Sequence, residues 1–271
     1  DWVFMDWADM DKDGPLCAEQ MLFIRALEAA ADCASLAGQD GSRYAAHAET
    51  LAKKLDAFFY DEEKGAYIDT YASRRRNVTR HANIFAILYD FADESKRASI
   101  VRNVLDNDGV PAITTPYFKF FELWANCKLG RVEKMLDQVR DYWGGMLALG
   151  ATTIWEEYDP RQTFPGHYAM YGDLFGKSLC HAWGAGPIDL IGRYVAGFRA
   201  EAPGCRAFAL EPRPSGLSAL DNVIPLPNGG QVQLCWDERE LRVLTDRPGG
   251  ALIWQGRRIP LEPGQELRVS R

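Results

Sequence analysis

A short acidic and aromatic segment in the middle of the chain carries the residues best suited to chemistry. Residues 152–159 read Thr-Thr-Ile-Trp-Glu-Glu-Tyr-Asp, so Glu156 directly follows Trp155. Aromatic faces stack on the C–H face of a pyranose ring, and carboxylates accept hydrogen bonds from its hydroxyls. Hydrolysis of a glycosidic bond needs two carboxyl groups, one protonated and one ionised. The segment therefore indicates a carbohydrate site, in which Glu156 is the best candidate for one of the two.

Polar and aromatic residues of the same kind recur at other places along the chain. They occupy the segments Met5–Asp9, Arg76–His81, Thr114–Tyr117 and Ser178–Trp183. These segments precede every second one of the helices predicted below, whereas the other connections hold mainly turn residues. In a ring of helical hairpins, every second connection opens on the same face. We therefore expect one concave site, lined by helix N-termini whose partial positive charge favours acidic groups and hydroxyl oxygens.

Each candidate also has a purely structural interpretation. The acids around Glu156 are equally typical of the solvated start of a helix, because a carboxylate in such a pattern is functional only in some proteins. His181 lies in an apolar stretch and is typical of a buried core histidine. Trp7 and Trp183 are as typical of core packing as of a surface on which a sugar stacks. Asp6 is of a residue type that commonly caps a helix.

The first 200 residues have the periodicity of helices. Apolar residues recur at three- and four-residue spacing, and the segments are bounded by Gly, Pro and capping residues. The predicted helices cover about residues 16–37, 44–58, 79–91, 94–105, 115–129, 132–149 and 178–198, the last with an irregularity at Gly184–Pro187. This order predicts a run of antiparallel helix pairs.

The composition changes near residue 200. The segment 201–271 is rich in Gly and Pro, lacks Lys, and shows two-residue alternation. Turn sequences separate its apolar runs, which is typical of strands. The predicted strands cover about residues 231–236, 241–245, 252–254 and 267–269. The chain is therefore predicted to be mainly α with a β domain, divided into residues 1–200 and a small antiparallel β-sandwich over 201–271.

Composition excludes several classes of protein. The 271 residues carry a net charge of −7, and beyond Arg74–Arg76 there is no basic cluster, which argues against nucleic acid as a partner. No apolar window is long enough for a membrane span. The six cysteines show no metal-binding spacing and are expected to be free thiols. No metal or cofactor is expected. The compartment is left open.

Several motifs together resemble a known family. Gly150–Glu156, Tyr142–Met146, Thr115–Tyr117, Asp6-Trp7, and Ser178–Trp183 followed by Ala185–Pro187 are similar to motifs of bacterial α-L-rhamnosidases, glycoside hydrolase family 78. They occur in the same order and at similar separations over nearly the whole chain. The resemblance implies an (α/α)₆ toroid followed by a β-sandwich, and inverting hydrolysis of terminal α-L-rhamnose from a glycoside or oligosaccharide.

The resemblance also implies roles for single residues. Glu156 matches the general base, and Trp7 and His181 match residues around the bound rhamnose. Asp6, Asn77, Tyr117 and Trp155 lie in matching segments and are expected to help to bind the substrate. The inverting mechanism implies no catalytic metal.

The family pattern extends beyond these residues. A six-hairpin toroid has about twelve helices, whereas seven are predicted here, and the family's segment with the general acid is expected upstream of Asp1. The chain is thus expected to hold an incomplete toroid, to need the remainder of the catalytic domain as its partner, and to show negligible hydrolysis by itself. Two alternatives stay open: another six-hairpin glycosidase, such as an α-glucosidase-like enzyme, and a sugar-binding module without catalysis.

Overall fold

The computed structural model describes residues 4–271, apart from the side chain of Asn228; residues 1–3, the start of the predicted helical part, lie outside the described range. The chain separates into two compact units. One comprises Asp1–Leu129 and Gly145–Gly184, and the other comprises Gly130–Gly144 and Ala185–Arg271. The predicted fold class, mainly α with a β domain, is confirmed. The domain boundary at residue 200 stays a prediction.

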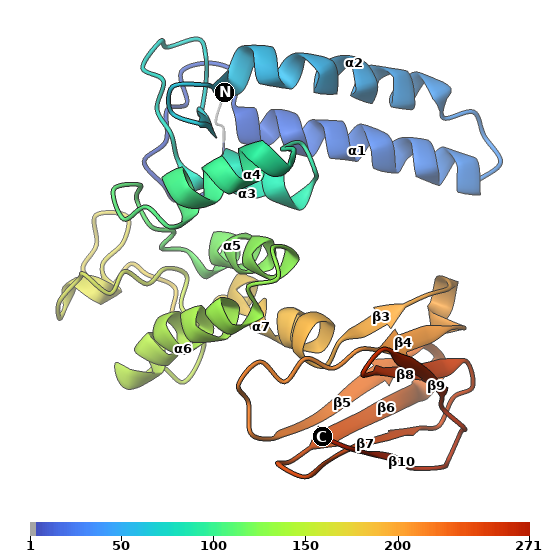
Figure 1. The fold of residues 1–271 in the computed structure, drawn as a ribbon. Helices are drawn as coiled ribbons and strands as arrows, with labels where there is room; N and C mark the ends of the chain where they lie inside the picture. Colours follow the sequence, from blue (N-terminus) through green and yellow to red (C-terminus); the bar gives the residue numbers. More distant parts are fainter. Residues whose placement is uncertain (1–3) are drawn as a thin grey trace. The chain divides into compact units, whose positions relative to one another are not determined.

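The first unit is built from helices that follow the sequence pattern closely. It contains α1 (Cys17–Leu36), α2 (Ser42–Phe59), the short β1 (Tyr60–Asp61) and β2 (Ala66–Tyr67), α3 (Arg80–Leu88), α4 (Glu94–Ile100) and α5 (Pro116–Lys128). A π-helical stretch, Val101–Leu105, continues α4. Helices α1 and α2 form an antiparallel hairpin (Figure 1), and α3 packs on both α1 and α5. Their inner faces form one continuous core.

The helix α5 shows how the sequence determines an element that matters for the site. The hydroxyl of its N-cap residue, Thr115, accepts a hydrogen bond from the Phe118 amide at 3.3 Å, and Pro116 occupies the first turn. A hydroxyl at the N-cap and a proline in the first turn both favour a helix start, since proline lacks the N–H that would have no partner there. The helix therefore begins directly behind Thr115, with Tyr117 in its first turn.

One predicted helix is wrong in its extent. The segment Ser178–His181 is not helical; a single 3₁₀ turn, Ala182–Gly184, is followed by α7 (Pro187–Leu190) and a π-helical stretch, Ile191–Val195. Pro187 lies in the first turn of α7, where its missing N–H does no harm. The apolar periodicity of 178–186 therefore belongs to an irregular connection, and the helix begins only at the proline.

The second unit holds two four-stranded sheets, in addition to α7 and most of α6 (Val132–Ala148). One sheet has the order β10-β7-β6-β5 and is antiparallel throughout; it contains β5 (Leu220–Leu226), β6 (Gly230–Trp236), β7 (Glu240–Thr245) and β10 (Leu267–Ser270). The other has the order β3-β4-β8-β9 and contains β3 (Phe198–Ala200), β4 (Phe208–Leu210), β8 (Gly250–Trp254) and β9 (Arg257–Pro260).

The predicted strands correspond to β6, β7, β8 and β10, and their alternation matches burial. Val232, Leu234 and Trp236 are buried on β6, opposite the buried Leu241 and Val243 of β7. Buried residues on both sheets are typical of a β-sandwich. The sequence pattern did not predict β3, β4, β5 or β9. It also did not predict the parallel pairing of β4 with β8.

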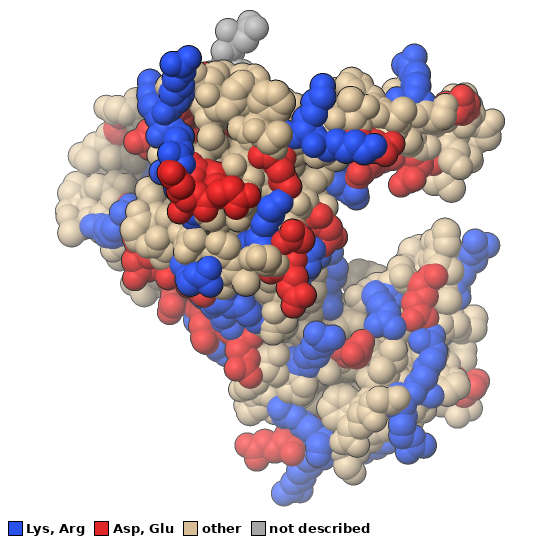
Figure 2. All heavy atoms as spheres, turned by 45° about the horizontal axis from the view of Figure 1, so that its top comes forward, with Lys and Arg blue, Asp and Glu red and all other residues tan. Residues whose placement is uncertain are grey.

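Two further properties bear on the classes excluded above. Within residues 4–271, no helix has the length and apolarity needed to cross a bilayer. All six cysteines are free thiols, as predicted. On the face shown in Figure 2, acidic and basic side chains are interspersed on both units.

Candidate active site

The carboxyl group of Glu156 is held from two sides. The Tyr171 hydroxyl donates a hydrogen bond to Oε1, and the Ser178 amide donates to Oε2 at 3.1 Å. Glu156 is only 5% exposed. Burial of a carboxyl group is costly unless it is hydrogen-bonded, and these two donors offset part of that cost.

The backbone around Glu156 is fixed by two other segments of the same unit. The Glu156 amide donates to the Ser178 carbonyl at 2.9 Å, the His181 amide donates to the Ile154 carbonyl at 2.8 Å, and the Tyr158 amide donates to the Thr114 carbonyl at 2.8 Å. The irregular segment 152–158 is therefore fastened on one edge to the connection before α7 and on the other to the residue before the Thr115 cap. This network brings together three of the segments that the sequence singled out.

Trp7 is connected to the same carboxyl group through Tyr171. The Trp7 and Tyr171 rings contact each other edge to face, with centroids 5.4 Å apart and an interplanar angle of 75°. Phe4 contacts the Trp7 ring in a similar way at 4.9 Å. The half-buried Trp7 is thus held between two aromatic rings, and Tyr171 connects it to Glu156.

Tyr117, Trp183 and His181 form a second aromatic group. The Tyr117 and Trp183 rings are stacked, with centroids 5.2 Å apart and 16° between their planes, and His181 contacts Trp183 at 4.4 Å. The indole N–H of Trp183 donates to the Glu156 carbonyl at 3.2 Å. Tyr117 and His181, both predicted site residues, are therefore linked through Trp183 to the backbone of the predicted base.

Asp6 is buried and accepts several hydrogen bonds. Its Oδ1 accepts from the Thr115 hydroxyl at 2.6 Å and from the Trp7 amide at 2.9 Å, and its Oδ2 lies 2.9 Å from Nε2 of His81. Asp6 is only 1% exposed. Burial of the Tyr117 hydroxyl and the nearby Asp6 carboxylate raise the pKa of Tyr117. Asp6 thus fixes the segment before Trp7 to the cap of α5.

Asn77 is joined to Asp6 by a chain of buried polar groups. The Asn77 amide group donates to Asp69 Oδ2 at 2.6 Å, the Thr79 hydroxyl donates to Asp69 Oδ1 at 2.7 Å, and Thr79 Oγ1 lies 3.2 Å from Nδ1 of His81. His81 completes the chain to Asp6. Asn77 is half-buried, and the structure places it three hydrogen bonds away from His81 rather than beside Glu156.

Trp155 is packed into the interior of the unit. It is 3% exposed, its ring is parallel to His167 at 6.3 Å, and Tyr158 and Tyr168 contact its edges. With so little exposed surface, the ring supports the backbone of Glu156 and offers no open face for stacking. The next acid, Glu157, pairs with Lys177 at 2.5 Å.

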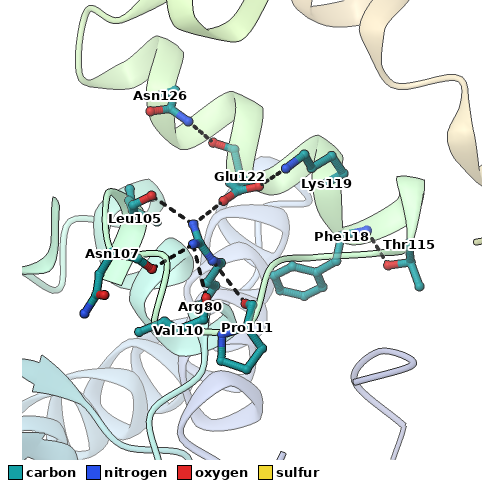
Figure 3. Close-up of polar contacts among 10 residues, drawn as sticks. All are labelled: Arg80, Leu105, Asn107, Val110, Pro111, Thr115, Phe118, Lys119, Glu122 and Asn126. Atoms are coloured by element: carbon teal, nitrogen blue, oxygen red, sulfur yellow. Dashed lines mark hydrogen bonds and ion pairs between the residues drawn. The ribbon is translucent and has the colours of Figure 1, made fainter. Parts of the chain in front are cut away.

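A buried ion cluster supports the connection that leads to Thr115 (Figure 3). Arg80 on α3 pairs with Glu122 on α5 at 2.8 Å, and Lys119 pairs with the other Glu122 oxygen at 2.6 Å. Arg80 also donates to the carbonyls of Leu105, Asn107, Val110 and Pro111. Burial alone would raise the pKa of Glu122, but the Lys119 and Arg80 charges outweigh it and lower that pKa. Arg80 therefore holds residues 105–111 against α5.

Sequence analysis missed several residues of this site. Tyr171, Asp69 and His81 were assigned no role, although His81 ends one of the segments singled out above. The signal for Tyr171 was the Tyr-Gly-Asp sequence at 171–173, which is typical of a turn. Asp69 precedes no predicted helix, so the spacing argument did not include it.

A helical unit that surrounds a buried carboxylate with Trp and Tyr rings has the makeup of a helical glycosidase domain. A model of the bacterial alpha-L-rhamnosidase six-hairpin glycosidase domain matches residues 1–195, and the chain belongs to this family. The family assignment made from the motifs is confirmed. Among curated proteins, no significant match was found.

Solved structures agree with this assignment. The chain is similar to a GH78 family rhamnosidase of Bacillus sp. GL1, at 28% identity over 93% of this chain with a TM-score of 0.79, and to a rhamnosidase from Klebsiella oxytoca with rhamnose bound, at 28% identity over 71% with a TM-score of 0.60. An α-L-rhamnosidase from Streptomyces avermitilis complexed with L-rhamnose shares the fold, at 15% identity over 86% with a TM-score of 0.65. The chain spans 28%, 36% and 22% of those chains, respectively.

Proposed function

We propose that this chain contributes the general base and part of the sugar pocket of an inverting α-L-rhamnosidase. The observation that carries the proposal is the Glu156 carboxyl group, which is buried and yet receives hydrogen bonds from Tyr171 and Ser178. A carboxylate stabilised in this way can accept a proton from a water molecule that attacks the anomeric carbon. Trp7, Tyr117 and His181 are the proposed substrate-binding side chains.

The other site residues receive supporting roles in this proposal. Asp6 has its oxygens occupied by Thr115, Trp7 and His81, so we assign it to positioning and not to proton transfer. Asn77 supports Asp6 indirectly, through the hydrogen bonds of Asp69, Thr79 and His81. Trp155 holds the backbone of Glu156. The general acid is proposed to come from a segment N-terminal to Asp1, because an inverting enzyme needs a second carboxyl group about 6.5–9.5 Å from the first.

The experiment is an assay of the full-length protein with 4-nitrophenyl glycosides. Hydrolysis of the α-L-rhamnoside with little hydrolysis of the α-D-glucoside supports the proposal, because rhamnose carries a methyl group where glucose carries a hydroxymethyl group. Proton NMR of the first product should show the β-anomer, as inversion requires. Preference for the glucoside would favour another six-hairpin glycosidase. Rhamnose binding in calorimetry, without hydrolysis of any substrate, would favour a binding module.

A further inference from the structure

Tyr171 contacts two of the proposed site residues at once. Its hydroxyl donates to Glu156 Oε1, and its ring packs edge to face against Trp7 at 5.4 Å. Partial burial of the phenol and the neighbouring Glu156 carboxylate raise the pKa of Tyr171 to about 12. The phenol therefore keeps its proton at neutral pH and remains a hydrogen-bond donor to Glu156.

The backbone that presents Tyr171 is unusual for such a residue. Met170 and Asp173 exchange both backbone hydrogen bonds, at 2.9 and 3.0 Å, and close a tight turn around Tyr171 and Gly172. Both central residues have positive φ, 56° for Tyr171 and 80° for Gly172. Gly, Asn and Asp dominate such turns, because a bulky side chain in the left-handed region costs free energy. Residues held in that region cluster at active sites, so the side chain at this position points to a functional need.

The hydrogen bonds to Glu156 show what that need is. Ser178 supplies one donor from the backbone, to Oε2, and Tyr171 supplies the other from a side chain, to Oε1. Donors on both oxygens fix the plane of the carboxyl group. Each carboxylate oxygen can accept more than one hydrogen bond, so Oε1 can still receive a water molecule. Tyr171 is 62% exposed, and it therefore reaches the buried carboxylate from the solvent side.

We propose that Tyr171 is the positioning residue of the catalytic base: its hydroxyl orients the ionised Glu156 carboxylate, while its ring holds Trp7 at a fixed angle beside it. This inference rests on the proposed function. The left-handed turn at 170–173 is the device that carries the phenol to both partners. Removal of the hydroxyl alone should affect the base, and removal of the whole ring should affect Trp7 as well.

The first test is Tyr171→Phe in the full-length protein with the nitrophenyl rhamnoside. This change keeps the ring against Trp7 and removes the donor to Glu156. We expect kcat to fall about tenfold or more, since a hydrogen bond to a charged group is worth at least that factor, while KM changes little. The acidic limb of the kcat–pH profile should move to higher pH, because the charged form of the base loses a donor. Leu174→Ala, an exposed change in the same loop, is the matched control and should leave kcat, KM and the pH profile unchanged.

A second variant separates function from folding. Tyr171→Gly relieves the left-handed conformation, so its thermal unfolding temperature should equal or exceed that of the wild type. It should nevertheless lower kcat and raise KM, because Trp7 loses its neighbour. A lower unfolding temperature with an unmoved pH profile would show that Tyr171 is merely structural and would overturn the inference.

The outcomes also distinguish this inference from the proposed function. If the wild type hydrolyses rhamnosides and Tyr171→Phe has the same kcat and the same acidic limb, the inference is wrong and the proposed function stands. If the wild-type full-length protein hydrolyses no rhamnoside, the proposed function fails and this catalytic role fails with it.

Discussion

His81 Nε2 lies 2.9 Å from Asp6 Oδ2, and the two side chains are 3% and 1% exposed. The Thr79 hydroxyl donates to Asp69 at 2.7 Å and lies 3.2 Å from His81 Nδ1. His81 therefore connects the Asp69 group to Asp6. A hydrogen bond to a carboxylate is stronger than one between neutral groups, so this pair holds Asp6 firmly in place.

Replacement of His81 should destabilise the first unit. His81→Gln leaves the buried Asp6 carboxylate with one fewer good donor, and we expect a loss of about 1–3 kcal/mol in the free energy of unfolding. Urea unfolding followed by tryptophan fluorescence measures it. His47→Gln, at an exposed position on α2, is the control and should change stability by less than about 0.5 kcal/mol. Equal stability of the two variants would contradict the role given to the Asp6–His81 pair.

Replacement of the proposed base should abolish most turnover without loss of the fold. Glu156→Gln keeps the shape of the side chain but cannot take a proton, so kcat for the nitrophenyl rhamnoside should fall about 10²- to 10⁴-fold in the full-length protein. Rhamnose binding measured by calorimetry should persist. The neighbouring Glu157→Gln is a control for the chemistry, because Glu157 pairs with Lys177. A larger loss of kcat in Glu157→Gln than in Glu156→Gln would reassign the base.

The buried ion cluster should make stability depend on pH. Because the folded-state pKa of Glu122 lies below its ordinary value of 4.5, its contribution is fully present above that value and is lost as the pH falls through the folded pKa. Glu122→Gln should lower the free energy of unfolding by about 3–5 kcal/mol at pH 7, since Arg80 and Lys119 are left buried without a carboxylate. The difference from the wild type should shrink below pH 4.5 in urea titrations. The exposed Glu94→Gln should show no such dependence, and a pH-independent difference for Glu122→Gln would argue against the cluster.

A close approach at Gly184 should couple packing to catalysis. A Cβ atom at this buried glycine would lie 2.2 Å from Ile154 Cγ2 and 3.1 Å from Pro116 Cβ. Gly184→Ala should therefore displace the segment that leads to Glu156, at a cost of about 1–3 kcal/mol in stability. The resulting misplacement should also reduce kcat, by up to about 10²-fold. Gly192→Ala, where a Cβ meets no atom within 4 Å, is the control; if both variants behave alike, the Gly184 contact is unimportant.

The sequence predicted the helices well because their signals are local. Thr115 and Pro116 mark the start of α5, and Asp93 caps α4 by accepting from the Lys96 amide at 2.9 Å. The region 178–186 was mispredicted, because apolar spacing does not distinguish a helix from an irregular segment held by distant partners. Its hydrogen bonds go to Ile154 and Glu156, which lie far away in sequence. Strands β3 and β4 were missed since each is only three residues long.

The site shows the same difference between local sequence signals and contacts that only the tertiary fold creates. Glu156 and Trp7 stood out by residue type, and the structure joins them through Tyr171. The link itself was out of reach of sequence reasoning, since it depends on the left-handed turn at Tyr171. The Asn77 network was equally hidden, because Asp69 and His81 act only through contacts that the tertiary fold creates.

The irregular connection before α7 has a consequence for how such a site can diverge during evolution. Between the end of α6 and the start of α7, the chain that carries Glu156 has no helix longer than a single 3₁₀ turn, and Phe164, Leu174 and Phe175 protrude from it into solvent. Connections of this kind tolerate insertions and exchanges of side chains that a packed helix does not. Residues 159–165 can therefore acquire new lengths and new aromatic groups while Ile154, Ser178 and the turn at 170–173 keep Glu156 in place, so this part of the loop is where relatives should evolve different preferences for the group attached to the sugar.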